Sequence, residues 1–178
     1  MSEGASVNVS AISMSPHVGT HADAPLHVRD GWPASDTFAL DAFIGPAIVI
    51  GLEQAEGAVG PSALASRLPS RVERLLLRTG RTIAGGTFPA SWPALTPAGV
   101  AWLLARGLRL LGVDAPSVDD RESKTLPTHH ALFEGGAWIL ENLDLRGVAD
   151  GRYELIALPL RVEGLDAAPV RAVLVEAV

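Results

Sequence analysis

The sequence contains no cysteine, which excludes disulfide bonds and thiolate metal ligands and fits a reducing compartment. Positive charge is also scarce, because 14 basic residues stand against 20 acidic ones, for a formal net charge of −6. This balance argues against the phosphate backbone of a nucleic acid or an anionic membrane surface as the main partner. We therefore expect neither a nucleic acid nor a membrane among the partners.

Long apolar runs and a secretory leader are absent as well. No apolar run approaches the roughly twenty residues of a membrane span, and the start Met1-Ser-Glu lacks the basic and apolar regions of a signal peptide. With 178 residues, 48% of them hydrophobic, the chain is long enough for one well-packed domain and short for two. We expect a single domain over residues 1–178 in a cytoplasmic protein.

What the chain does have is a cluster of histidines. Three of its five histidines lie in one short segment, which reads HVGTHADAPLH from His17 to His27. His17, His21, Asp23 and His27 occupy odd positions, and apolar residues fill most of the even ones. Because side chains alternate along an extended backbone, the polar groups would share one face, where His21 and Asp23 can bind one ion together.

The backbone must bend for all four side chains to meet. At roughly 3.3 Å per strand residue, His17 and His27 would lie far apart on a straight strand. Gly19-Thr20 and Pro25 supply the unusual dihedral angles that two bends require, and they oppose an amphipathic helix, the alternative structure. Imidazole and carboxylate without thiolate suit zinc, manganese or ferrous iron, and bridging carboxylates also allow a two-metal centre.

The rest of the chain alternates between apolar runs and short helical patterns. The sequence predicts helices at 61–67, 97–107 and 128–134, the second with Thr96 as N-cap. It predicts strands at 7–14, 43–52, 72–78, 108–113, 137–140, 153–160 and 170–176. Because strands outnumber helices, we expect a mixed α/β domain with a twisted sheet.

Further candidate ligands come from the second half of the chain. One of the adjacent His129 and His130 could complete a two-metal site while the other faces elsewhere; the alternative is an exposed polar helix. Glu141 follows a predicted buried strand, where a carboxylate is costly unless a positive group or a donor compensates it. The alternative is that the strand has already reached water at Glu141.

Other residues are candidates for substrate contacts. Asp114 and Ser117 belong to a polar cluster with Asp119 at the end of a predicted buried strand, a usual place for a site. A solvated loop or a helix cap is the alternative for this cluster. Trp32 and Phe38 follow the histidine segment and could line an aromatic pocket, although such residues more often belong to the core.

The histidine segment resembles the signature of the cyclase-like metal-dependent hydrolases, the family that includes the bacterial kynurenine formamidases, or arylformamidases. The matching positions are His17, Gly19, Thr20, His21, Asp23, Pro25 and His27. The similarity continues in the segment GVDAPSVD at 112–119 and in the spacing of His129 and Glu141. It therefore spans the chain from about residue 7 to the C-terminus.

This resemblance implies a ligand set for two divalent metal ions, Zn²⁺ or alternatively Mn²⁺. His17, His21 and Asp23 would bind the first ion. Asp23 and Glu141 would bridge to a second ion, which also takes His129.

The reaction that the resemblance implies is hydrolysis of N-formyl-L-kynurenine to L-kynurenine and formate in tryptophan degradation, with His27 as general acid/base. The implied fold is a swivelling β/β/α arrangement with a central mixed sheet, and relatives are usually homodimers. Relatives usually carry an additional N-terminal segment ahead of the part that matches here, so we expect either a truncated or reannotated start or a substrate pocket finished by another element, with metal binding retained. Two alternatives stay open: a related amide hydrolase acting on isatin, with manganese, and a metal-binding module without turnover.

Overall fold

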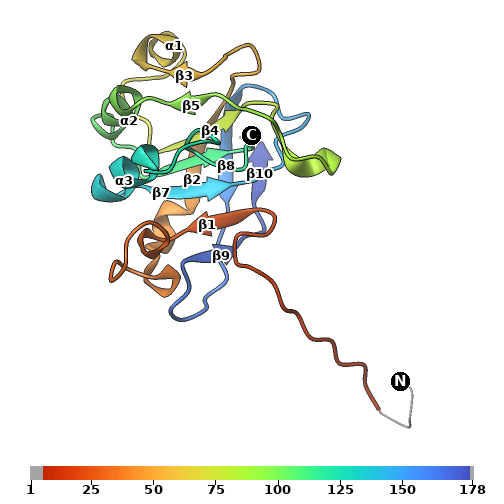
Figure 1. The fold of residues 1–178 in the computed structure, drawn as a ribbon. Helices are drawn as coiled ribbons and strands as arrows, with labels where there is room; N and C mark the ends of the chain where they lie inside the picture. The colour runs from red at the N-terminus through yellow and green to blue at the C-terminus, as the bar shows by residue number, and fades with distance from the viewer. Residues whose placement is uncertain (1–5, 177–178) are drawn as a thin grey trace.

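A mixed β-sheet organises the chain (Figure 1). The computed structural model describes residues 6–176, and within them eight strands form one sheet in the order β10-β8-β2-β4-β6-β7-β1-β9. The central strands are parallel: β2 (Ile44–Gly51), β4 (Arg74–Arg78), β6 (Leu110–Val113) and β7 (Trp138–Glu141). The outer strands pair antiparallel: β8 (Gly151–Ile156), β10 (Val173–Glu176), β1 (His21–Asp23) and β9 (Ala167–Pro169). A short parallel pair, β3 (Ala58–Val59) and β5 (Ala94–Leu95), lies outside this sheet.

The α-helices of the described residues pack on one face of the sheet (Figure 1). They are α1 (Pro61–Ala65), α2 (Pro97–Leu104) and α3 (Pro127–Glu134). Helix α2 begins as the sequence predicts, because the Thr96 hydroxyl accepts a hydrogen bond from the Gly99 amide at 3.0 Å. Within residues 6–176, no helix combines the length and the apolar character that crossing a membrane requires.

The apolar strands are buried on both faces, as expected for the parallel part of a sheet. Leu75 and Leu77 of β4 pack against the helices, together with Leu111 of β6. Leu76, between the first two, points to the opposite face, where it joins a second cluster around Phe43. Short 3₁₀ helices lie at Pro25–His27, Ser35–Thr37, Leu40–Ala42 and Ile83–Gly85.

The expected α/β class with a central mixed sheet is confirmed, and the predicted helices are present: the first two end earlier than predicted, and the third begins one residue earlier. The predicted strands from residue 43 onward are present with shifted ends: β8 stops at Ile156, and β10 begins at Val173. The strand predicted at 7–14 is wrong, since these residues form no ladder and run away from the sheet (Figure 1). Its alternating side chains, such as Val7 and Val9, are exposed, because alternation makes a strand only where a partner strand pairs with it.

Candidate metal centre

The pairing of β1 brings the two halves of the chain together. β1 runs antiparallel to β7, and His21 lies directly opposite Glu141. On its other side β1 pairs with β9. Because side chains alternate along a strand, His21, Asp23 and Glu141 share one face, whereas Ala22 enters the core on the other. The sheet register therefore places an imidazole and two carboxylates together.

Two bends bring the ends of the histidine segment to the same place. Gly19 precedes β1 with a φ of +68°, a left-handed conformation that glycine adopts readily. Pro25 begins the 3₁₀ helix Pro25–His27 directly after β1. As a result, the ring centroids of His17 and His27 lie 4.2 Å apart. The structure thus has the bent backbone that the sequence indicates.

Helix α3 supplies the imidazole from the far half of the chain. His129 is 2% exposed, and its Nε2 lies 3.3 Å from Asp23 Oδ2 and 3.4 Å from Glu141 Oε1. The ring of His130 faces elsewhere and makes an edge contact with Trp32, at 5.9 Å between centroids. One histidine of the pair faces the centre, and the other does not.

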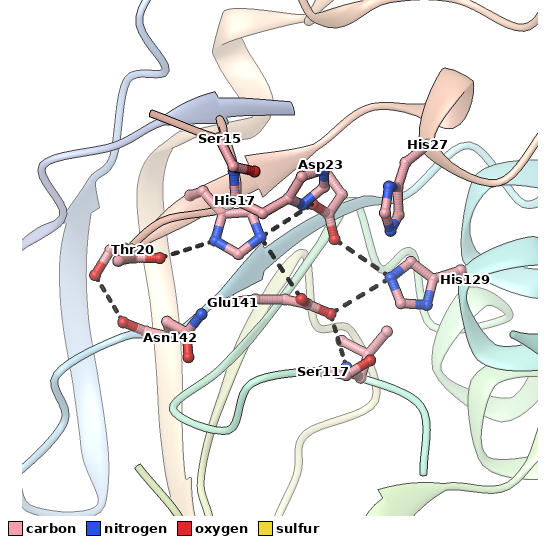
Figure 2. Close-up of polar contacts among 12 residues, drawn as sticks. Ser15, His17, Thr20, Asp23, His27, Ser117, His129, Glu141 and Asn142 are labelled. Atoms are coloured by element: carbon pink, nitrogen blue, oxygen red, sulfur yellow. Dashed lines mark hydrogen bonds and ion pairs between the residues drawn. The ribbon is translucent and has the colours of Figure 1, made fainter. Parts of the chain in front are cut away.

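The two carboxylates each face more than one imidazole (Figure 2). Asp23 Oδ1 lies 3.0 Å from His17 Nδ1 and 3.2 Å from His21 Nε2. The other oxygen, Oδ2, faces His129. Glu141 repeats this division, with Oε2 at 3.7 Å from His21 Nε2 and Oε1 near His129. The donors therefore form two adjacent subsets that share both carboxylates.

The carboxylates of the centre are fully or almost fully buried. Asp23 is 0% exposed and Glu141 is 5% exposed. Burial raises the pKa of Glu141, and the neighbouring Asp23 carboxylate raises it further. Burial also opposes ionisation of Asp23, but the nearby imidazoles of His129, His17 and His21 outweigh it and hold the pKa of Asp23 well below its usual range. The two carboxyl groups thus differ strongly in acidity.

The nearby carboxylates raise the pKa of three imidazoles of the centre. Burial lowers the pKa of His17, but the nearby carboxylates of Asp23 and Asp166 outweigh burial and raise the pKa to about 9. His21 and His129 are likewise raised, against burial, by their carboxylate partners. His27 behaves differently, since burial lowers its pKa and the charges of His17 and His129 lower it further against the pull of Asp23.

The centre has the donors that a divalent cation requires. His21 Nε2 and Asp23 Oδ1 are buried 3.2 Å apart, and none of their close contacts has hydrogen-bond geometry, a costly arrangement that a bound cation would relieve. His21, Asp23 and Glu141 offer ligand atoms that all lie within 4.8 Å of one another, and so do His17, Asp23 and His27. Imidazole and carboxylate are ligands that divalent transition metals accept. The residues present therefore fit a divalent metal ion.

Comparison with known proteins agrees with this chemistry. The Cyclase family model matches residues 3–120. The chain belongs to the Cyclase family. It is 45% identical over 170 residues to a kynurenine formamidase of Bordetella avium, covering 96% of this chain and 81% of that protein.

Solved structures place this Cyclase-family protein among metal-dependent hydrolases. A potential metal-dependent hydrolase with cyclase activity matches with a TM-score of 0.84 and 32% identity, over 92% of this chain and 81% of that one. Isatin hydrolase A from Labrenzia aggregata, bound to benzyl benzoate, matches with a TM-score of 0.73 and 27% identity, over 91% and 74% of the two chains. The resemblance noted from the sequence is confirmed.

Each inward-facing imidazole of this family member has an acceptor on its outer nitrogen. His21 Nδ1 donates to the Gly19 carbonyl at 2.8 Å. His17 Nε2 lies 3.1 Å from Asp166, and His129 Nδ1 lies 2.6 Å from Asp119. Such outer partners orient the ligating nitrogen in metal sites. These hydrogen bonds to the outer nitrogens therefore fix the orientation of the three rings.

Sequence reasoning missed Asp166 entirely and treated Asp119 only as part of a loop cluster. Asp166 directly precedes β9, and its carbonyl accepts a hydrogen bond from the Ala24 amide at 2.9 Å. Only the β1–β9 pairing brings it to the histidines, and no local pattern around it marks such a contact. The signal for Asp119 was its place after a buried strand, close to Ser117.

The two substrate contacts predicted from the polar cluster, Ser117 and Asp114, lie in different surroundings. Ser117 lies beside Glu141 (Figure 2), and its hydroxyl accepts a hydrogen bond from the Asp119 amide at 3.1 Å. Asp114 has a structural role: its carboxylate accepts hydrogen bonds from the amides of Thr79 and Gly80 at 2.8 and 2.9 Å. Both carboxylate oxygens of Asp114 are therefore bonded to the turn after β4 and are not available to a substrate.

The two aromatic candidates also differ. Trp32 is half-buried, contacts His130, and so lies near the start of the helix that carries His129. Phe38 is 9% exposed and packs against Phe43 and Trp138 in the core. The structure therefore places Phe38 in the hydrophobic core and not in an aromatic pocket. It follows the 3₁₀ helix Ser35–Thr37, and its ring joins the apolar cluster around Phe43.

Proposed function

We propose that this protein is a metal-dependent arylformamidase that hydrolyses N-formyl-L-kynurenine to L-kynurenine and formate. The observation that carries the proposal is the buried centre in which His21 Nε2 and Asp23 Oδ1 lie 3.2 Å apart and no hydrogen bond satisfies either atom. The kynurenine formamidase relatives, at 45% identity over nearly the whole of this chain, support the substrate class.

We infer two ions in this centre, Zn²⁺ in the first instance and Mn²⁺ as the alternative. His17, His21 and Asp23 would hold the first ion, and Asp23 and Glu141 would link it to a second ion, which His129 would also hold. The shared carboxylates support this division. When bound, such ions lower the pKa of water and polarise a carbonyl oxygen, the two tasks that amide hydrolysis needs.

His27 is our candidate for the general acid/base. Its side chain is 30% exposed, whereas those of His21 and His129 are 2% exposed, so it borders the accessible side of the centre. Its lowered pKa keeps the imidazole neutral near pH 7 and able to take a proton. It would take the proton of the attacking water as the oxygen bonds to the formyl carbon, and return it to the aryl amine as the C–N bond breaks.

Geometry also allows a second role for His27. Its ligand atom lies within 4.8 Å of those of His17 and Asp23, so it could bind an ion directly. The metal content of His27→Ala separates the two roles, since an acid/base residue can be removed without loss of metal.

Ser117 and Trp32 stay proposed substrate contacts, because they lie beside Glu141 and His130, respectively. We propose neither Asp114 nor Phe38 as a substrate contact, because Asp114 bonds to the turn after β4 and Phe38 lies in the core. The single domain over residues 1–178, the cytoplasmic location and the homodimer stay predictions from the sequence.

The test combines metal analysis with formate release from N-formyl-L-kynurenine, before and after chelation. We expect about two ions per chain, loss of turnover on chelation, and recovery with Zn²⁺ or Mn²⁺. Bound ions without hydrolysis of any aryl formamide would instead favour a metal-binding module. Preferential hydrolysis of isatin would favour the activity named for the isatin hydrolase neighbour.

A further inference from the structure

One short loop contacts two of the residues that would hold the second ion, Glu141 and His129. The backbone N–H of Val118 donates to Glu141 Oε1 at 2.8 Å. The next residue, Asp119, places Oδ2 at 2.6 Å from His129 Nδ1. Residues 117–119 therefore contact a carboxylate from β7 and an imidazole from α3 at the same time.

Asp119 is held firmly in this position. Its side chain is 2% exposed, and its carboxylate accepts hydrogen bonds from the backbone amides of Thr128 at 2.8 Å and His129 at 3.1 Å. These amides open helix α3, where the first N–H groups have no partner within the helix. From behind, the indole N–H of Trp92 donates to the Asp119 carbonyl at 2.7 Å.

The chemistry of this contact decides which nitrogen of His129 carries the proton. An ionised carboxylate only accepts hydrogen bonds, so Nδ1 must be the donor. A neutral imidazole with its proton on Nδ1 presents a free lone pair on Nε2. That nitrogen is the one that faces Asp23 Oδ2 and Glu141 Oε1.

We propose that Asp119 is the positioning residue of the second metal ion, because it fixes both the tautomer and the ring orientation of His129. This inference rests on the proposed two-metal function. It assigns a functional task to a carboxylate that would otherwise serve only as a cap for helix α3.

The chain offers a matched control in Asp114. This residue is also 2% exposed, also follows a central strand, and also accepts hydrogen bonds from two backbone amides, those of Thr79 and Gly80. Within residues 6–176, its recorded hydrogen bonds go to these two residues and to no imidazole. Asp114→Asn therefore removes a buried charge of the same kind without touching His129.

The experiment titrates metal-free wild type, Asp119→Asn and Asp114→Asn with Zn²⁺ against a chromophoric chelator. Asparagine keeps the volume but replaces one acceptor by a donor, so it cannot serve both the backbone amides and His129 Nδ1. In Asp119→Asn we expect one ion to bind about 10- to 100-fold more weakly and the other to bind unchanged. In Asp114→Asn we expect wild-type affinity for both ions.

Two ions bound at wild-type affinity by Asp119→Asn overturn the inference and leave the proposed function standing. Equal weakening in Asp114→Asn also overturns it, because the effect would then be general destabilisation. A wild-type protein that binds no divalent ion removes the inference and the proposed function together.

A second measurement does not depend on the folding of any variant. In the zinc-loaded wild type, ¹⁵N NMR of the imidazoles should show His129 with its proton on Nδ1 and none on Nε2. The opposite tautomer contradicts the assignment of Asp119.

Discussion

Asp23 faces the imidazoles of both proposed ion sites, so Asp23→Asn should abolish the stabilisation that divalent ions give to the protein. Its Oδ1 faces His17 and His21, and its Oδ2 faces His129. The amide of asparagine keeps the shape, but it presents only one acceptor and no charge. Neither subset of ligands then keeps a full anionic donor set.

The size of the effect follows from linkage. At a free-ion concentration about 1,000 times the Kd, each ion that binds only the folded state adds about 4 kcal/mol to the free energy of unfolding. For a chain of 178 residues, each kcal/mol shifts the melting temperature by about 2–4 °C, so chelation should lower the wild-type value by about 8–16 °C for each ion bound.

Differential scanning calorimetry with and without a chelator measures this shift. We expect a shift near zero for Asp23→Asn and a wild-type shift for the control Asp114→Asn, whose carboxylate binds Thr79 and Gly80. A wild-type protein that melts at the same temperature with and without divalent ions would refute the reasoning. So would an Asp23→Asn protein that retains the full shift.

Other substitutions test the acid/base assignment and the packing of the helices against the sheet. His27→Ala should lower kcat by about 10²- to 10⁴-fold at unchanged metal content, and normal turnover or loss of an ion would contradict its assignment. Gly99→Ala should destabilise the protein by about 1–3 kcal/mol in urea denaturation, because the added Cβ would lie 2.9 Å from the Val59 carbonyl oxygen; an unchanged midpoint would show that α2 can shift. Leu111→Ala, at a fully buried position of β6, should cost about 2–5 kcal/mol at an unchanged m-value, and a smaller loss would mean that the core between the sheet and the helices collapses into the space.

The sequence predicted the part of the centre that depends on local spacing. His17, His21, Asp23 and His27 lie within one segment, and the bends at Gly19 and Pro25 follow from the conformational preferences of those two residues. Glu141 was predictable because a carboxylate at the end of a buried strand requires compensation. In each case the signal lies within a few residues of the site residue itself.

What the sequence did not reveal depends on pairing between distant segments. Asp166 reaches His17 only because β9 pairs with β1. The segment 7–14 alternates as a strand would, yet alternation does not specify a partner, and the structure has no ladder there. Phe38 follows the histidine motif closely, but closeness along the chain does not determine on which side of the sheet a ring lies.

The register of β1 therefore determines the geometry of the site. A slip of one residue would turn Ala22 toward the metal face and send His21 and Asp23 into the core. Three strand residues alone provide few ladder bonds, but contacts at both ends extend the pairing. The Thr20 hydroxyl donates to the Asn142 carbonyl at 2.7 Å, and the amides of Ala24 and Val170 donate to the carbonyls of Asp166 and Thr20 at 2.9 and 3.0 Å. Because these bonds flank β1, they hold His21 opposite Glu141, and the geometry of the centre follows from that register.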